Sequence, residues 1–278
     1  MKFDFLNLKF IIGAFLLGFV LFLALFGNLI TPFTANKQSL MDSLLPPLSG
    51  GHILGTDHLG RDYLSRLIYG GRISLAVGVL GVLFSSLIGV SLGLVAGYFR
   101  GTVDDIIMRV VDVFMSVPLL LLALMIIFIL GPSFTNILIV FALARWMLFC
   151  RVTRGMVMSL REQAFIDAAK ALGCTDQRII LRHVLPNLIA PILTLAALEV
   201  PRNILTESTL SFLGFGIQPP DSSWGLMLSQ GRQYIVTIFL TALSFNLFGV
   251  WLRAVTDPLQ RWRLLKATKE AKEAGVTF

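Results

Sequence analysis

The feature that most constrains this chain is a series of long runs without a charged side chain. The run Ile73–Phe99 has 27 residues and no charge, whereas about 20 apolar residues suffice for a helix to cross the hydrocarbon core of a membrane. Similar runs, each with few or no charges, cover Phe10–Ile30, Val113–Leu130 (interrupted by Pro118), Phe134–Cys150, Leu188–Leu213 and Tyr234–Leu252. The sequence therefore predicts an all-α integral membrane protein with about six transmembrane helices.

Composition excludes an ordinary soluble domain. Hydrophobic residues make up 56% of the chain and charged residues 14%, while a soluble domain has roughly a quarter of its residues charged. The net charge of +7 could suggest nucleic-acid binding, but the basic residues lie in short connections between apolar runs. Basic loops of membrane proteins are retained on the cytoplasmic side. We therefore expect a multi-pass membrane protein, with both termini cytoplasmic and no nucleic-acid partner.

This topology divides the chain into four parts. We expect a cytoplasmic N-terminus, a first span with an extracytoplasmic segment, a core of the remaining spans that holds a cytoplasmic loop, and a cytoplasmic tail. The corresponding ranges are 1–9, 10–72, 73–256 with the loop at 151–187, and 257–278. The two cysteines, Cys150 and Cys174, lie at or beside the cytoplasmic loop, where a reducing environment predicts free thiols.

Small residues recur every four positions in the second run. Ser85, Gly89, Gly93 and Gly97 form a ridge that allows a neighbouring backbone to approach closely, as is common between membrane helices. Two interpretations are open: the ridge packs against another helix of the same chain, or it forms an interface with a second subunit.

The central connection predicts two short helices. Ser159 and Glu162 have the spacing of a capping box at a helix start. The helix that follows has small or short side chains on one face, at Ala164, Asp167, Ala168 and Ala171. Such a face suits close contact with another protein.

A turn and a second helix follow. Gly173 suits the left-handed position after a helix end, and Thr175 can cap a second helix that Pro186 should stop after Leu185. Helix–glycine–helix is also typical of DNA-binding domains, but the neighbouring membrane spans argue against that function.

Four stretches of the sequence resemble the permeases of ABC importers for dipeptides, oligopeptides and nickel. The stretch Asp167–Asn187, DAAKALGCTDQRIILRHVLPN, is similar to the EAA motif of that family. LGTDHLGRDYLSRLIYGGRISL (Leu54–Leu75), SFLGFGIQPPDSSWGLML (Ser211–Leu228) and FNLFGVWLRAVTDP (Phe245–Pro258) resemble its other signatures. The resemblance implies a permease subunit that imports a small peptide or a related solute, with a nickel or metal-chelate importer as the alternative.

The resemblance also implies partners and site residues. The partners would be a second homologous permease, one or two ABC ATPase subunits, a periplasmic or surface solute-binding protein and membrane lipid. The residues that couple to the ATPase would be Ala164, Asp167, Ala168, Ala169, Gly173, Leu185 and Pro186. Because the sequence has no G-x-x-x-x-G-K-[ST] phosphate loop, we expect no cofactor in this chain, no enzymatic activity, and ATP bound by the partner subunits.

The sequence departs from the family pattern near its end. The stretch of about a dozen residues that the family usually carries between GRQY and the last span is missing. Gly249-Val250 also stands where the family has Gly-Asp. Both differences concern the outer gate and the last span.

Four charged residues lie inside expected spans, namely Arg145, Glu199, Arg202 and Glu207. Ionisable residues within a membrane usually face one another or a wet cavity. All four are candidates for the lining of the translocation path. For Glu199 and Arg202 a second interpretation is open, because they are three residues apart and can form a structural ion pair on one helix face. These charges also raise the alternative of an ion-coupled secondary transporter.

No catalytic constellation or metal-binding pattern is present in the sequence. His52 and His58 lie in the expected extracytoplasmic segment Thr31–Arg72, called the outer segment below, without further ligands nearby in sequence. Two loop histidines are too few for the usual metal coordination, so we interpret them as polar surface residues.

Overall fold

The computed structural model describes residues 2–230 and 235–256, and the regular structure within them is helical. The elements in chain order are α1 (Lys2–Ile30), η1 (Leu40–Asp42), α2 (Tyr63–Phe99), α3 (Gly101–Met115), α4 (Leu119–Leu130), α5 (Phe134–Arg161), α6 (Ala164–Ala171), α7 (Asp176–Ile179), η2 (Ile180–Val184), α8 (Leu185–Phe212), α9 (Trp224–Gln230) and α10 (Ile235–Thr256). The expected all-α architecture is confirmed for this part of the chain. The expected tail 257–278 lies outside the described residues.

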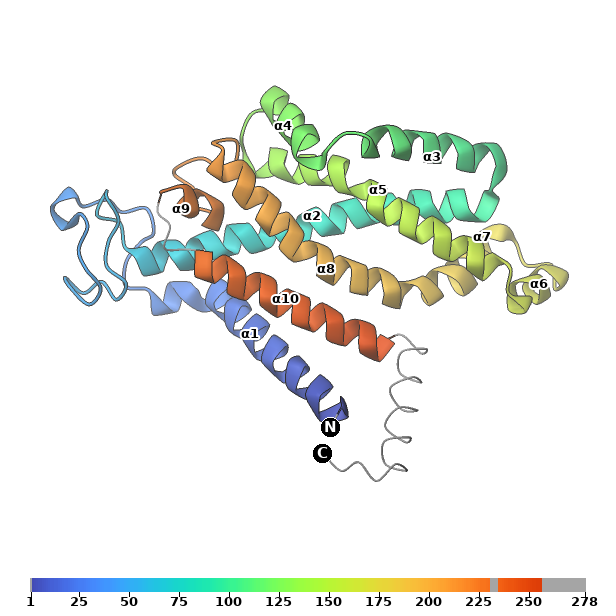
Figure 1. Ribbon diagram of the computed structural model, residues 1–278, viewed down its shortest axis with the longest axis horizontal. Coiled ribbons are helices and arrows are strands. Elements are labelled where there is room, and N and C mark those ends of the chain that lie inside the picture. Colours follow the sequence, from blue (N-terminus) through green and yellow to red (C-terminus); the bar gives the residue numbers. More distant parts are fainter. Residues whose placement is uncertain (1, 231–234, 257–278) are drawn as a thin grey trace.

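Long apolar helices form the body of the protein. By length and composition, three runs of the described residues could cross a membrane, namely Tyr63–Phe99, Phe134–Arg161 and Asp176–Phe212. A fourth is added if α3 and α4 count as one broken span. In Figure 1, the outer segment before α2 and the α6–α7 pair lie at opposite ends of the long axis.

The helices α2 and α5 lie side by side along much of their length (Figure 1). A methyl group added to any of the ridge glycines would overlap a carbonyl oxygen of α5. The distances would be 2.3 Å from Gly89 to Trp146, 2.6 Å from Gly93 to Cys150, and 2.7 Å from Gly97 to Arg154. Both series advance by four residues, so the backbones remain close over two helical turns. The ridge therefore packs inside the chain, which confirms the first of the two interpretations.

The stretch expected as the third span is broken. Val113–Met115 belongs to α3, and α4 begins at Leu119 after a bend of 88°. Pro118 lies at the start of α4, and a proline disfavours helical backbone at the residue before it, here Val117. A single straight helix over Val113–Leu130 is therefore wrong, and α3 and α4 form an elbow instead.

Two further groups of helices complete the bundle. The helices α1 and α10 pack against each other, and α10 also packs on α8. Short α9 lies against α2 and α8, where the Trp224 amide donates to the Ser74 hydroxyl at 3.0 Å and its indole nitrogen donates to the Leu67 carbonyl at 2.9 Å. The described part of the expected last span is α10, while Gly231–Tyr234 lies outside the described residues.

The glycine ridge gives a direct stability prediction. Gly93→Ala should lower the free energy of unfolding by about 1–3 kcal/mol, because its new methyl group would overlap the Cys150 carbonyl and the two helices would have to separate. Gly155→Ala is the matched control on α5: no atom lies within 4 Å of its added methyl group. This change should be neutral or stabilise by up to about 1 kcal/mol through helix propensity. Thermal unfolding in detergent measures both, and equal midpoints for the two variants would contradict the packing.

Candidate functional site

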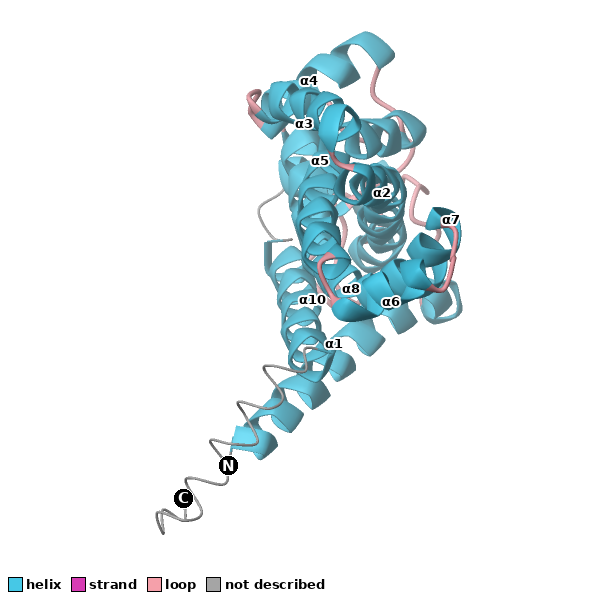
Figure 2. Cartoon of the chain, turned by 90° about the vertical axis from the view of Figure 1, so that its right-hand side faces the viewer, coloured by secondary structure: helices cyan, strands magenta, loops and turns pink. Residues whose placement is uncertain are grey.

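The connection between α5 and α8 projects as a compact helix pair at one end of the bundle (Figure 2). α6 ends in a left-handed residue, since Gly173 has φ +77°. The Gly173 amide donates to the Lys170 carbonyl at 2.9 Å, and the Cys174 amide donates to the Ala169 carbonyl at 3.1 Å. These two bonds make a Schellman turn, so the predicted role of Gly173 as the residue after the helix end is confirmed.

The predicted start of α6 is wrong. Ser159 lies within α5, which continues to Arg161, so Ser159 and Glu162 do not form a capping box. Gln163 occupies the N-cap position of α6 and makes no capping bond with its side chain. Thr175 does precede α7 as predicted, but its side chain also makes no capping bond.

Pro186 does not stop the second helix, so this prediction is also wrong. It lies in the first turn of α8, directly after the π-helical segment η2. A proline is tolerated in a first helical turn, where its missing amide hydrogen is not needed. In the π-helical segment before it, the backbone hydrogen bonds join residues i and i+5 instead of i and i+4. The chain therefore continues from α7 to α8, with Leu185 half-buried and Pro186 exposed.

The predicted small face of α6 is exposed. Its members are Ala164, Asp167, Ala168 and Ala171, and all four lie on the surface. Ala169 is buried instead and packs with Ile166 in a hydrophobic cluster at this end of the bundle. Ala169 therefore packs α6 onto the bundle and is not part of the exposed face.

Two large apolar side chains flank the small face. Phe165 and Leu172 are 44% and 84% exposed, and with Ala168 they have the i, i+3, i+7 spacing of one helical stripe. This stripe is a candidate contact surface. The sequence interpretation missed both, although a count of apolar positions at helical spacing would have found them.

The charges inside the expected spans form a cluster around Glu199. The Glu199 carboxylate is 1% exposed and pairs with Arg145 at 3.0 Å and with Arg202 at 2.5 Å. The predicted pair of Glu199 and Arg202 is confirmed. Arg145, expected as a path-lining residue, is the more buried partner, and it also donates to the Thr206 hydroxyl at 2.9 Å.

Glu207 is fully buried and makes its own contacts. Its Oε1 accepts from the Ser211 hydroxyl at 2.6 Å and from the Ser223 hydroxyl at 2.8 Å, while Oε2 has no partner among the described residues. Ser223 also accepts from the Leu226 amide at 3.1 Å. Glu207 therefore connects α8 to the start of α9, and these bonds do not include Arg145.

Arg145 also borders a cavity of about 250 Å³ at the elbow between α3 and α4. The other walls are apolar and come from three elements, with Phe114, Met115, Val117, Pro118, Leu119, Leu122, Ala144, Met147 and Leu148. The hollow therefore lies at the bend of the expected third span, with Arg145 of α5 in its wall.

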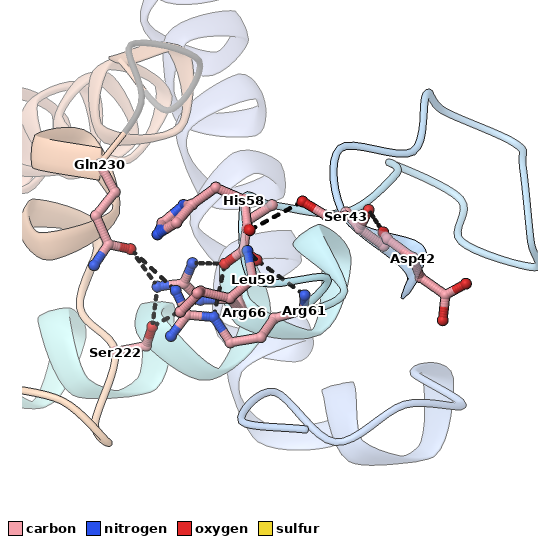
Figure 3. Close-up of polar contacts among 10 residues, drawn as sticks. Asp42, Ser43, His58, Leu59, Arg61, Arg66, Ser222 and Gln230 are labelled. Carbon is pink, nitrogen blue, oxygen red and sulfur yellow. Dashed lines mark hydrogen bonds and ion pairs between the residues drawn. The ribbon is translucent and has the colours of Figure 1, made fainter. Parts of the chain in front are cut away.

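At the opposite end, the Gly-Thr-Asp-x-x-Gly-Arg-Asp stretch folds into a buried ionic network (Figure 3). Asp57 pairs with Arg61 at 2.7 Å and with Arg66 at 2.5 Å. Arg66 also donates to Gln230 at 2.8 Å and to Ser222 at 3.2 Å. Burial opposes ionisation of Asp57, but hydrogen bonds from Arg61 and Leu59 and the Arg61 charge outweigh it and hold the pKa of this carboxyl below its ordinary value. The network fastens the outer segment to α2 and α9.

The histidines of the outer segment differ from one another. His58 is exposed as predicted, but His52 is buried and its Nδ1 lies 2.9 Å from Asp62 Oδ1. Asp62 also caps α2 through the Ser65 amide at 2.8 Å. Within the described residues, no group of three or more His, Cys, Asp or Glu side chains could hold a metal ion. Cys150 and Cys174 are free thiols, as predicted.

The Glu199 cluster predicts which second change rescues the loss of the carboxylate. Glu199→Gln should lower the abundance of folded protein, because removing one partner of a buried ion pair costs about 3–5 kcal/mol and Arg145 is mostly buried. Adding Arg145→Gln should restore abundance. Adding Arg202→Gln should not, because Arg145, the more buried of the two partners, would remain without its carboxylate. Size-exclusion chromatography of tagged protein measures abundance, and equal rescue by both second changes would contradict the assignment.

Comparisons with known proteins agree with this architecture. The family model described as "Binding-protein-dependent transport system inner membrane component" matches residues 89–262. The chain is 38% identical to the glutathione transport system permease protein GsiD of Pectobacterium atrosepticum, over 85% of this chain and 82% of that protein. It is 40% identical to the dipeptide transport system permease protein DppC of Alkalihalophilus pseudofirmus, over 89% and 85%. These matches confirm the resemblance seen in the motifs.

A solved structure supports the fold. A chain of the MetNI methionine ABC transporter, in an inward-facing conformation, aligns with a TM-score of 0.55 and 17% identity, over 70% of this chain and 94% of that chain. The likeness concerns the fold alone. The family match over residues 89–262 and the relatives at 38–40% identity exclude the alternative of a secondary transporter. The chain belongs to the family of inner membrane components of binding-protein-dependent transport systems, and it is a permease subunit of an ABC importer.

Proposed function

We propose that this permease forms, with a second homologous permease, the import path for small peptides or glutathione-like peptides. The observation that carries the proposal is the similarity to relatives named as dipeptide and glutathione permeases over more than four fifths of the chain. A third relative, the di/tripeptide permease DppC of Pseudomonas aeruginosa, is 38% identical over 88% of this chain and 86% of its own length. All three names describe short peptides.

In the proposed topology, six helices cross the bacterial inner membrane and both termini are cytoplasmic. The spans are α1, α2, the broken pair α3–α4, α5, α8 and α10. This arrangement places the α6–α7 pair in the cytoplasm and the outer segment outside, where a solute-binding protein delivers its cargo. The separation of these two segments along the long axis supports it (Figure 1).

The α6–α7 pair is the proposed docking element for a separate ATPase subunit, which binds ATP. Three features support this role: the exposed small face around Ala168, the flanking Phe165 and Leu172, and the rigid turn at Gly173. Burial of the opposite face, with Ile166 and Ala169 in the core, fixes the pair to the bundle. A force applied to the exposed face would therefore reach the spans.

Arg145 is the proposed contact for a peptide carboxylate in transit. It borders the cavity at the elbow, and the apolar walls suit a hydrophobic side chain. Its pairing with Glu199 holds the guanidinium in place. Glu207 and Arg202 are not proposed to contact the peptide. Glu207 is buried against α9, and Arg202 pairs with Glu199.

The docking role is tested by Ala168→Trp. The large side chain should prevent close approach of the ATPase, so ATPase recruitment and uptake of labelled dialanine or glutathione into proteoliposomes should fall at least about tenfold, the effect of about 1.4 kcal/mol of lost binding. Ala168→Ser keeps the face small and should leave both unchanged. Normal recruitment by the Ala168→Trp protein would refute the docking role, and a wild-type complex that imports neither peptide would refute the proposed solute.

Thiol labelling tests the topology. Single cysteines at Met41, which is 97% exposed in the outer segment, and at Gln177, which is exposed on α7, are placed in a chain that lacks Cys150 and Cys174. An impermeant maleimide added to cells with a permeabilised outer barrier should label the first site and not the second, whereas lysed cells should label both. The reverse pattern would invert the topology.

A further inference from the structure

Tyr98 lies where α2 meets the α6–α7 pair. Its side chain is 3% exposed and belongs to the same hydrophobic cluster as Ile166 and Ala169 of α6 and Ile179 of α7. The cluster also includes Val157 of α5 and Leu188 of α8. One aromatic ring at the end of α2 therefore shares a core with both short helices and with the two spans that flank them.

The polar atoms of Tyr98 contact the start of α7 and the end of α5. Its hydroxyl donates to Asp176 Oδ1 at 2.5 Å, and Asp176 is the first residue of α7. Its backbone carbonyl accepts from the Arg161 guanidinium at the end of α5. The same guanidinium lies 5.5 Å from the centre of the tyrosine ring, within the range of a cation–π interaction.

The preceding turn of α2 is fastened to α5. Gly97 packs against the Arg154 carbonyl, and the Arg154 side chain forms a bidentate ion pair with Asp104 of α3. Arg100 pairs with Glu162 at 2.9 Å across the same junction. The end of α2 is thus held to α5 and α3 by backbone packing and charge, whereas among the described residues its side-chain hydrogen bond to α7 is the one from Tyr98.

We propose that Tyr98 is a positioning residue that makes α7 move together with the α2–α5 pair, so that motion of the docking element reaches the spans. This inference rests on the proposed docking role of α6–α7. The hydroxyl carries the function, since a phenylalanine ring would fill the same space in the cluster but could not hold Asp176. A hydrogen bond to a charged partner is stronger than a neutral one, and it is directional, unlike the apolar contacts around it.

A distance measurement tests the coupled motion without any solute. Spin labels are attached to Ser91→Cys, exposed on α2, and Gln177→Cys, exposed on α7, in a chain without Cys150 and Cys174, assembled with its partner subunits. We expect one distance distribution that is the same before and after trapping with ATP and vanadate. Adding Tyr98→Phe should shift or broaden it after trapping. A shift of several ångströms in the protein that keeps Tyr98 would overturn the proposal.

The ratio of import to ATP hydrolysis gives the functional test. Tyr98→Phe should lower the labelled dialanine or glutathione imported per ATP by at least about tenfold, the factor that a net contribution of about 1.5 kcal/mol, the lower bound for a hydrogen bond to a charged group, gives. Recruitment of the ATPase should stay normal, because the exposed face of α6 is unchanged. Tyr69→Phe, the same change near the opposite end of α2, is the matched control and should leave the ratio unchanged.

A double-mutant cycle separates this bond from a general effect on folding. Asp176→Ala removes the other partner of the same bond. Because Asp176 is exposed, this variant keeps the hydrophobic core intact even if Tyr98→Phe reduces assembly. The combined variant should be no worse than either single change, because the same bond is lost only once. Multiplied effects in the double variant, or a wild-type ratio in Asp176→Ala, would refute the role of Tyr98. Loss of ATPase recruitment by the wild-type chain would instead refute the proposed function.

Discussion

Close packing of two helix backbones organises this permease. In a membrane, apolar side chains gain nothing from leaving water, so helices associate through van der Waals contact and through polar bonds. Between α2 and α5, glycines at every fourth residue bring the backbones so close that a methyl group at Gly89 would overlap the Trp146 carbonyl. This contact fixes the register of the two helices, since a shift by one residue would place a larger side chain against the same carbonyls.

The α2 helix is long enough to make contacts at both ends of the protein. With 37 residues it spans about 55 Å at 1.5 Å per residue. At its first turn, Asp62 caps it and Arg66 joins the ionic network with Asp57. At its last turn, Tyr98 contacts the α6–α7 pair. A single helix therefore connects the segment proposed to face the incoming solute with the segment proposed to receive the ATPase.

Charge within the bundle is arranged so that few ionised groups stand alone. A charged side chain at the centre of a bilayer costs about 2.5–3.5 kcal/mol on insertion scales, and pairing reduces that cost. Glu199 lies between Arg145 and Arg202, and its carboxylate forms an ion pair with each of them. The elbow between α3 and α4 leaves a hollow beside Arg145, which combines an apolar wall with a fixed cation at one place.

The sequence by itself determined the features that depend on near neighbours. Runs of apolar residues defined the helical class, the four-residue spacing of small residues defined the packing ridge, and Gly173 defined the turn after α6. Each of these follows from helix geometry or from the backbone freedom of one residue. The exposed face around Ala168 was predictable for the same reason, although the flanking Phe165 and Leu172 were overlooked.

Only the tertiary structure decided the features that depend on distant partners. Arg145 and Glu199 are separated by 54 residues, so neither local spacing nor propensity could pair them. Pro186 lies within the continuous helical stretch from α7 through η2 to α8. Ala169 is buried because it packs in one hydrophobic cluster with residues of α2, α5 and α8. The direction of the bend at Pro118 was likewise outside local rules, because a proline interrupts a helix but the packing of α4 against α5 sets where the chain goes next.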